Sequence, residues 1–278
     1  MALIEQLREE ATLYLSVFER VPTDMILWQA GEPDRREVTK IRGVPYREAG
    51  KPWPLDTEGA PLNFVAQFCF SDSRDLVPPL PGDVLLIFAA GQTLVSLVDN
   101  QPFYVVRWGD GLFFEWVWLG DFPLATAAEI PTTPWPVMPC FGSLYRTWDC
   151  RVPPDFDLPE SHDGIAVLDG SKIGGVCPWI LDRDYTRLDQ EIGIPGAYLC
   201  TLGSVDTAVY TSDPEFLSPS PLSQWGGHEE ESWQQRRAAG QTEWERTHEL
   251  ALMIGDLGLL NFFLGDVGSV RWTAHGQT

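Results

Sequence analysis

Two segments far apart in the chain share one short pattern, and this repeat constrains the fold more than any other feature. The first reads TKIRGVPY at residues 39–46, and the second reads SKIGGVCPW at residues 171–179. In both halves an apolar segment that contains a cysteine comes later, and an apolar segment rich in Phe follows it. Because three matches occur in the same order, the sequence predicts an internal duplication.

The apolar segments of the two halves predict strands. In the first half these are residues 25–30, 62–70 and 84–89, followed by three more strands between residues 93 and 120. Turn signals separate them, which favours an antiparallel meander. In the second half, residues 198–205 match 64–70, and residues 259–263 match 85–88.

The chain is predicted to be a single domain, residues 1–278, with an α+β fold of mostly antiparallel sheets in two pseudo-repeated halves. The halves span about residues 22–120 and 163–272. Residues 2–20 place apolar side chains at steps of three or four, which predicts an N-terminal amphipathic helix. Residues 121–162 are rich in proline and read as a loop-like connector. Residues 206–250 have no copy in the first half and are predicted to be a partly helical insertion.

The repeated pattern does not match a phosphate-binding loop. A Walker loop places its lysine after the glycines, whereas Lys40 and Lys172 precede them here. We therefore expect Gly43, Gly174 and Gly175 to provide a positive φ or a close backbone approach in a turn. A ligand-binding role stays open for Lys40, for Lys172 and for Asp256, which lies between glycines and otherwise caps a turn.

The charge of the chain restricts its partners. Lys and Arg number 19 against 40 Asp and Glu, which gives a net charge of −21. Such a chain lacks the positive surface that nucleic acids and anionic membranes attract, so we expect it to bind neither. The acidic excess either keeps the protein in solution or forms a face for a basic partner.

The sequence carries few groups that could do chemistry. The five cysteines have no CxxC spacing and the four histidines show no HExxH pattern, so we predict no disulfide framework, metal site or cofactor. No GxSxG elbow is present, and no catalytic residue is predicted. A Cys–His pair stays open for Cys140 and Cys150, which the connector could expose. Without a secretory signal or an apolar span of about 20 residues, we expect a cytoplasmic protein.

The motifs in ordered combination resemble the YwqG-like domain family over residues 38–90 and 165–265. In the first half the resemblance rests on residues 40–45, Trp53-Pro54 with Asp56 and Gly59, residues 62–67 and residues 81–88. In the second half it rests on SKIGG and GDLGLLNFF. Arg42 replaces a usual glycine, Cys177 precedes Pro178, and YLCTLGS replaces a Gln-rich strand. The resemblance implies an α+β fold with two similar halves and provides no catalytic residues. It also implies a protein-binding role, because some members lie in toxin–immunity neighbourhoods.

The leading hypothesis is therefore a non-enzymatic protein-binding protein, specifically an immunity protein that neutralises a basic toxin. The acidic insertion supplies the predicted contact residues, with tryptophan anchors. These residues are Glu229, Glu230, Glu231, Trp233, Trp244 and Glu245. Two alternatives stay open. One is a small-molecule-binding protein or enzyme with a site between the pseudo-repeats, formed by Lys40, Lys172 and Asp256. The other is a structural subunit of a larger complex.

Overall fold

The computed structural model describes residues 15–95, 102–107, 111–132, 139–152, 167, 170–178, 197–203, 205–206, 250–252, 254 and 256–277. The chain divides into two compact units. Unit 1 comprises Met1–Trp28, Ser73–Leu80 and Ser143–Thr278, and unit 2 comprises Gln29–Asp72 and Pro81–Gly142. No helix among the described residues is long and apolar enough to cross a membrane.

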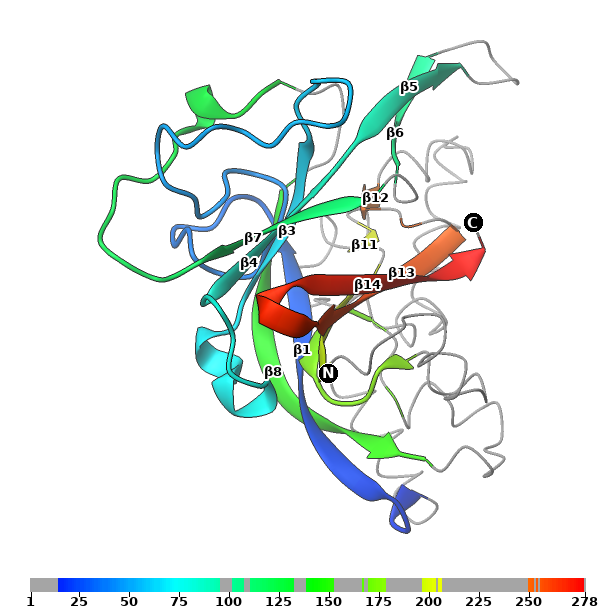
Figure 1. Cartoon of the computed structure of the whole chain (residues 1–278). Coiled ribbons are helices and arrows are strands. Elements are labelled where there is room, and N and C mark those ends of the chain that lie inside the picture. The colour runs from blue at the N-terminus through cyan, green and yellow to red at the C-terminus, as the bar shows by residue number, and fades with distance from the viewer. Residues whose placement is uncertain are drawn as a thin grey trace. The chain divides into compact units, whose positions relative to one another are not determined.

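Unit 2 contains an antiparallel set of strands in the order β8-β2-β3-β4-β7. Their bounds are Lys40–Ile41 for β2, Asn63–Cys69 for β3, Val84–Ala89 for β4 and Leu112–Val117 for β7, and the first residues of β8 (Cys140–Arg151) complete the set. Every residue of β3 and β4 is buried. Their near-continuous apolar character follows from burial on both faces. β4 and β7 lie side by side (Figure 1).

One face of β3 and β4 carries a hydrophobic core inside unit 2. Its central residues include Phe64, Leu86 and Phe88, and Trp53 and Phe122 pack against them from the loops. The Trp53 ring meets Phe88 edge-on, with ring centroids 5.3 Å apart. Between β4 and β7 the chain forms a separate hairpin of β5 (Gly91–Val95) and β6 (Pro102–Val106), and after β7 it forms the short 3-10 helix η3 (Ala127–Glu129).

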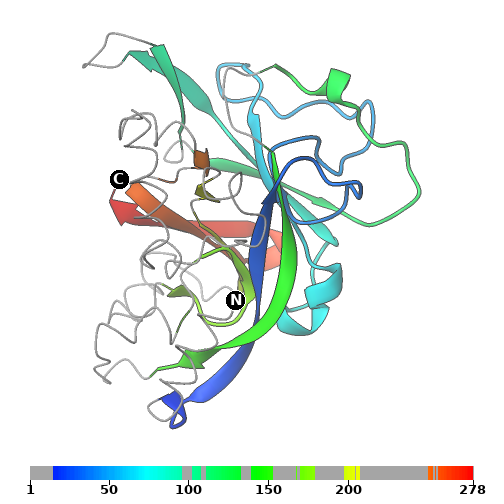
Figure 2. The ribbon, with the colours of Figure 1, turned by 180° about the vertical axis from the view of Figure 1, so that it is seen from behind.

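Unit 1 contains strands in the order β14-β13-β10-β9-β1-β8. Their bounds are Glu19–Ala30 for β1, Lys172–Gly174 for β9, Ala197–Gly203 for β10, Asp256–Leu264 for β13 and Val270–Gln277 for β14. β1, in blue, and β8, in green, run side by side in both views (Figure 1 and Figure 2). The unit also holds the two-stranded pair β11 (Val205–Asp206) and β12 (Leu250–Leu252) and the 3-10 helix η5 (Asp266–Gly268). The 3-10 helix η1 spans Ser71–Leu76.

The strands of the two units pair in the same way. In unit 2 the residues directly opposite one another are Lys40, Gln67, Leu86 and Glu115, one from each of β2, β3, β4 and β7. In unit 1 they are Lys172, Thr201, Asn261 and Thr273, one from each of β9, β10, β13 and β14. The register shifts at Phe64/Ala66 in β3 and at Tyr198/Cys200 in β10, which are matching positions in this alignment. The repeat seen in the sequence therefore corresponds to a repeated strand arrangement.

The prediction of an α+β fold with an N-terminal helix and a partly helical insertion is wrong. The described residues are mostly antiparallel strand, and the helical ones among them are Leu15 and the short 3-10 segments η1, η3 and η5. Glu19 and Arg20, placed at the end of the predicted helix, begin β1. Pairing with the distant β9 stabilises β1 as a strand, since strand formation depends on cross-strand neighbours, whereas residues 2–14 of the predicted helix lie outside the described residues. Of the insertion, only Asp206 and Leu250 are described, and both lie in strands.

The connector also differs from its prediction. Residues 121–162 contain β8, a strand of 12 residues, where the proline-rich composition indicated only loop. The prolines lie outside the strand itself, and the segment CFGSLYRTWDCR between them is free of proline. Cys140 and Cys150, which the sequence left as candidates for exposure, are both buried at the two ends of this strand.

Candidate functional site

The most unusual polar contact in unit 1 is a buried ion pair next to the repeated turn. Lys172 in β9 has no exposed surface, and its Nζ lies 2.8 Å from Oδ2 of Asp149, which is equally buried. The same carboxylate oxygen accepts a hydrogen bond of 2.9 Å from the backbone N–H of Val176. Asp149 thus binds both the lysine that begins the turn and the residue that ends it. Additional hydrogen bonds to a buried charge pair offset its desolvation cost, and the bond from Val176 to Asp149 does so here.

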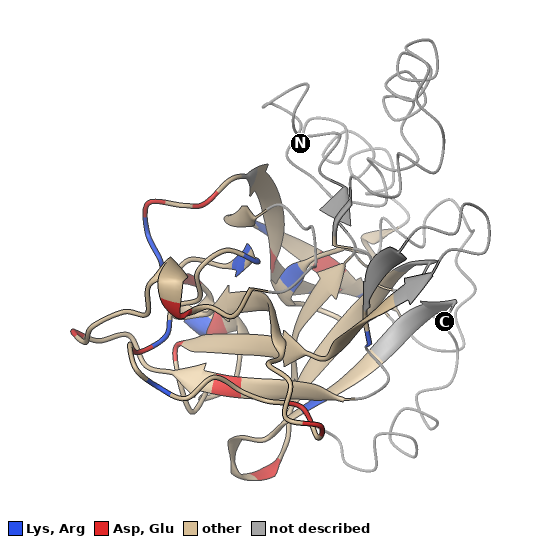
Figure 3. Ribbon diagram, turned by 90° about the horizontal axis from the view of Figure 1, so that it is seen from above, with Lys and Arg blue, Asp and Glu red and all other residues tan. Residues whose placement is uncertain are grey.

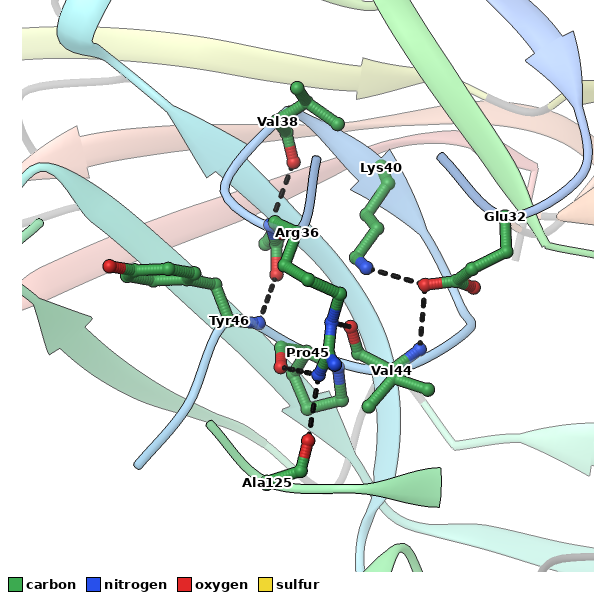
Figure 4. Close-up of polar contacts among 9 residues, drawn as sticks. Glu32, Arg36, Val38, Lys40, Val44, Pro45, Tyr46 and Ala125 are labelled. Carbon is green, nitrogen blue, oxygen red and sulfur yellow. Dashed lines mark hydrogen bonds and ion pairs between the residues drawn. The ribbon is translucent and has the colours of Figure 1, made fainter. Parts of the chain in front are cut away.

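Unit 2 contains the same arrangement around Lys40, in which one carboxylate oxygen binds both the lysine and a backbone N–H of the turn. Its Nζ lies 2.7 Å from Oε1 of Glu32, and that oxygen also accepts a bond of 3.2 Å from the N–H of Val44 (Figure 4). Lys40 is fully buried, whereas 35% of the Glu32 side chain is exposed. Burial lowers the pKa of Lys40, and the hydrogen bond to Glu32 opposes this effect. The two lysines therefore have the same role, but the pair in unit 2 is closer to solvent.

The two turns need glycine beside the carboxylate for two reasons. Gly43 and Gly175 have φ values of +70° and +78°, in the left-handed region that favours glycine. A Cβ on Gly43 would collide with Oε2 of Glu32, and a Cβ on Gly175 would collide with Oδ2 of Asp149. In unit 1 the preceding residue is Gly174, and in unit 2 it is Arg42 with a φ of 58°. The sequence prediction of a positive φ and a close approach is therefore confirmed at these turns.

The remaining predicted residues are placed as follows. Asp256 begins β13 opposite Gln277, and its side chain is outside the description. Glu229, Glu230, Glu231, Trp233, Trp244 and Glu245 all lie outside the described residues. Sequence reasoning missed Glu32 and Asp149. Glu32 lies only eight residues before Lys40, but Asp149 belongs to the unpredicted strand β8 and had no sequence signal.

A second polar cluster in unit 2 holds the loop that follows the turn. Nε of Arg47 lies 3.0 Å from Glu115 Oε2, and Nζ of Lys51 lies 2.7 Å from Oε1 of the same carboxylate. Arg47 also donates to the carbonyls of Lys51 and Pro52. Gln67 accepts from the N–H of Tyr46 and donates to the carbonyls of Arg36 and Val38. Gln67 and Glu115, which stand in line with Lys40 across the strands of unit 2, therefore bind the chain segments on either side of the turn.

Among the residues that are described, no group of three or more His, Cys, Asp or Glu side chains could hold a metal ion.

The five cysteines provide a simple check of the packing. All five are buried thiols. Burial raises the pKa of Cys69, and it raises the pKa of Cys140 to about 12. Because the thiolate is the reactive form, we expect none of the five to react with a soluble thiol reagent at pH 8 while the chain is folded. All five should react once guanidinium unfolds it. Rapid labelling of one folded-state cysteine, located by mass spectrometry, would contradict the packing around that residue.

Residues 39–108 match the family model described as "Domain of unknown function (DUF1963)". This range includes the first-half motifs from Lys40 to Phe88, so the match agrees in position with the resemblance to the YwqG-like family. The description assigns the family no activity. A search of curated proteins returns no match to this chain.

Proposed function

We propose that this chain is a non-enzymatic protein-binding protein that attracts a basic partner, and specifically an immunity protein that neutralises a basic toxin. The observation that carries the proposal is the placement of charge in unit 2. Its basic side chains are used mostly inside the fold, while its acidic side chains are mostly outside. The family resemblance supports the same role, because some YwqG-like members lie in toxin–immunity neighbourhoods.

The described residues of unit 2 present many acidic side chains to solvent. The exposed ones are Glu32, Asp34, Glu48, Glu58, Asp72, Asp121 and Glu129. The exposed basic residues of the same described segments are Arg35 and Lys51. Both are already paired, Arg35 with Glu37 at 2.7 Å and Lys51 with Glu115 at 2.7 Å. Figure 3 shows several of the acidic positions in connecting loops.

The other cations of unit 2 hold the chain together from within. Arg36 donates from its guanidinium to the carbonyls of Val44, Pro45 and Ala125, and burial lowers the pKa of Arg36 (Figure 4). Arg47 is 3% exposed and binds loop carbonyls and Glu115. Some positive charges of unit 2 are therefore buried. The surface of the unit is more acidic than its composition alone would predict.

An acidic surface increases the rate at which a basic partner associates and discourages acidic partners. The whole chain has a net charge of −21, so it attracts basic partners over a longer range than unit 2 alone would. The acidic insertion residues from Glu229 to Glu245 stay the predicted contact, with Trp233 and Trp244 as anchors. A cytoplasmic location is part of the proposal, since free cysteines persist in a reducing compartment.

Charge reversal in unit 2 tests the electrostatic part of this proposal. Glu48, Glu58 and Asp121 are exposed, so a triple change to lysine should leave the fold intact. Against the partner recovered from the source cell, we expect the association rate constant to fall about tenfold, and to fall similarly for the wild type when salt rises to about 0.5 M. Stopped-flow fluorescence measures the rate. The exposed neutral change Thr57→Asn is the control and should behave as wild type.

The immunity part has a separate test. Cells that express a toxin candidate encoded beside this chain's gene should regain growth when the chain is co-expressed. Growth that is not restored, although the chain binds the candidate, would reject the immunity role and retain protein binding. A partner with an acidic surface, or association rates that ignore salt and the triple change, would reject the electrostatic proposal.

A further inference from the structure

The loop that follows β7 places two large apolar residues at the surface of unit 2. Trp118 is 58% exposed, and Leu119 beside it is 38% exposed. The other tryptophans with described side chains are buried or partly buried, namely Trp28, Trp53, Trp116, Trp148 and Trp272. A tryptophan stabilises a fold most when its large ring is buried, so two adjacent apolar residues left at the surface indicate an interaction site.

Hydrogen bonds hold the backbone on both sides of this pair. The carbonyl of Val117 accepts from the N–H of Asp83 at 2.9 Å, and the N–H of Leu119 donates to Oδ2 of Asp83 at 2.8 Å. The carbonyl of Gly120 accepts from the hydroxyl of Tyr46 at 3.1 Å, and Tyr46 is buried. The two exposed residues therefore lie on a loop whose backbone is already ordered, which reduces the entropy cost of binding a partner.

The charge around the loop is acidic. Residues 75–145 contain one basic residue, Arg107. Asp83 bonds to the loop directly, and the exposed Asp121 lies two residues after Leu119. Two residues of extended chain span at most about 7 Å, which is less than the Debye length of about 8 Å at physiological ionic strength. The apolar pair therefore has carboxylates close enough to attract a cation.

We propose that Trp118 and Leu119 are the anchors of a docking site for a basic segment of a partner protein, in which arginine stands next to an apolar residue. The apolar side chain would pack against Leu119. The guanidinium would lie over the Trp118 ring and be attracted by the carboxylates of Asp83 and Asp121. This inference rests on the proposed function, because it names where in unit 2 the basic partner binds.

The chemistry of this surface favours such a segment over other occupants. Arginine stacks on aromatic faces, and its planar group is more weakly hydrated than the ammonium of lysine. A second copy of this chain would bring the same acidic loop against itself, and like charges in contact are unfavourable. An anionic membrane surface would be repelled for the same reason.

Peptide titration into the ¹⁵N-labelled full-length chain tests the site. The probe is Ac-Gly-Arg-Leu-Arg-Gly-NH₂, and the charge-reversed control is Ac-Gly-Glu-Leu-Glu-Gly-NH₂. We expect the arginine peptide to shift the indole N–H signal of Trp118 until it saturates, and the glutamate peptide to bind about tenfold more weakly or less. The variant Trp118→Phe identifies the signal, because it lacks that indole.

Two alanine variants separate the anchor from exposed apolar surface in general. Trp118→Ala should lose the saturable response, read at the backbone N–H of Leu119. Leu55→Ala is the matched control, since Leu55 is 57% exposed on another loop of unit 2. It should bind the arginine peptide as wild type does, and both variants should keep the wild-type urea midpoint. Shifts that stay linear, equal affinity for the two peptides, or an equal loss for Leu55→Ala would overturn the proposal.

Kinetics with the whole partner distinguish this site from the proposed function. Against the toxin candidate encoded beside this chain's gene, Trp118→Ala should raise the dissociation rate constant about 30-fold and leave the association rate constant within about twofold. An unchanged dissociation rate would reject the docking site and retain the proposed function. A candidate that does not bind would reject the immunity role, and the peptide titration would then decide the docking site by itself.

Discussion

Replacing Lys172 with alanine is expected to destabilise the protein by about 3–5 kcal/mol, the typical cost of removing one partner of a buried ion pair. The change leaves the carboxylate of Asp149 fully buried without its cation, since both side chains have no exposed surface. Equilibrium unfolding in urea, followed by tryptophan fluorescence, measures the loss as a lower midpoint with an unchanged slope.

The matched control for this change is Lys40→Ala. Glu32 remains 35% exposed and can be hydrated after its lysine is removed, so we expect a smaller loss. The double variant Lys172→Met/Asp149→Leu should recover part of the stability, because it removes both charges together. It should still lose about 1–3 kcal/mol, because the N–H of Val176 no longer has its acceptor. Equal losses of stability for Lys172→Ala and Lys40→Ala would show that the greater burial of Asp149 than of Glu32 does not matter.

Gly175→Ala should have an effect of similar size for a steric reason. The alanine would have to keep the backbone φ of +78°. Its Cβ would clash with Oδ2 of Asp149 and would lie 2.7 Å from Cβ of Thr23. The left-handed backbone costs an L-residue about 1–2 kcal/mol, and overpacking adds about 1–3 kcal/mol. Guanidinium unfolding of the variant therefore should show a loss of about 2–5 kcal/mol.

Gly50→Ala separates the two contributions. Gly50 has a similar φ of +71°, but nothing lies within 4 Å of the position that its Cβ would take. We expect this variant to show only the backbone cost of about 1–2 kcal/mol. If Gly50→Ala and Gly175→Ala lower the stability equally, the clash of the new Cβ with Asp149 adds nothing to the loss of stability.

Several strands could be predicted because their signals are local. β3 and β4 are apolar segments of six or seven residues between turn residues, and the predicted ranges 62–70 and 84–89 contain both. The predicted segment at residues 198–205 overlaps β10 and was found in the same way. The pattern of a strand that is buried on both faces is visible in the sequence itself.

β1 was predicted only in part, as a short strand at residues 25–30, and β8 was not predicted. Both are long strands whose pairing partners lie far away in the chain, as when Thr23 of β1 stands opposite Gly174 of β9. Residues 2–20 had helical spacing, and residues 121–162 had the prolines of a loop. Neither local signal contains the cross-strand contacts that stabilise a sheet. The loop prediction for residues 121–162 was wrong at β8 for this reason.

The sequence by itself determined where the repeated turns lie, since a glycine after Lys-Ile permits a left-handed backbone and a lysine before the glycines excludes a Walker loop. The tertiary structure decided what the lysines do. Glu32 and Asp149 approach Lys40 and Lys172 only because the strands bring them there. A carboxylate in the chain has no preferred partner until the backbone is folded, because burial and distance set the strength of an ion pair.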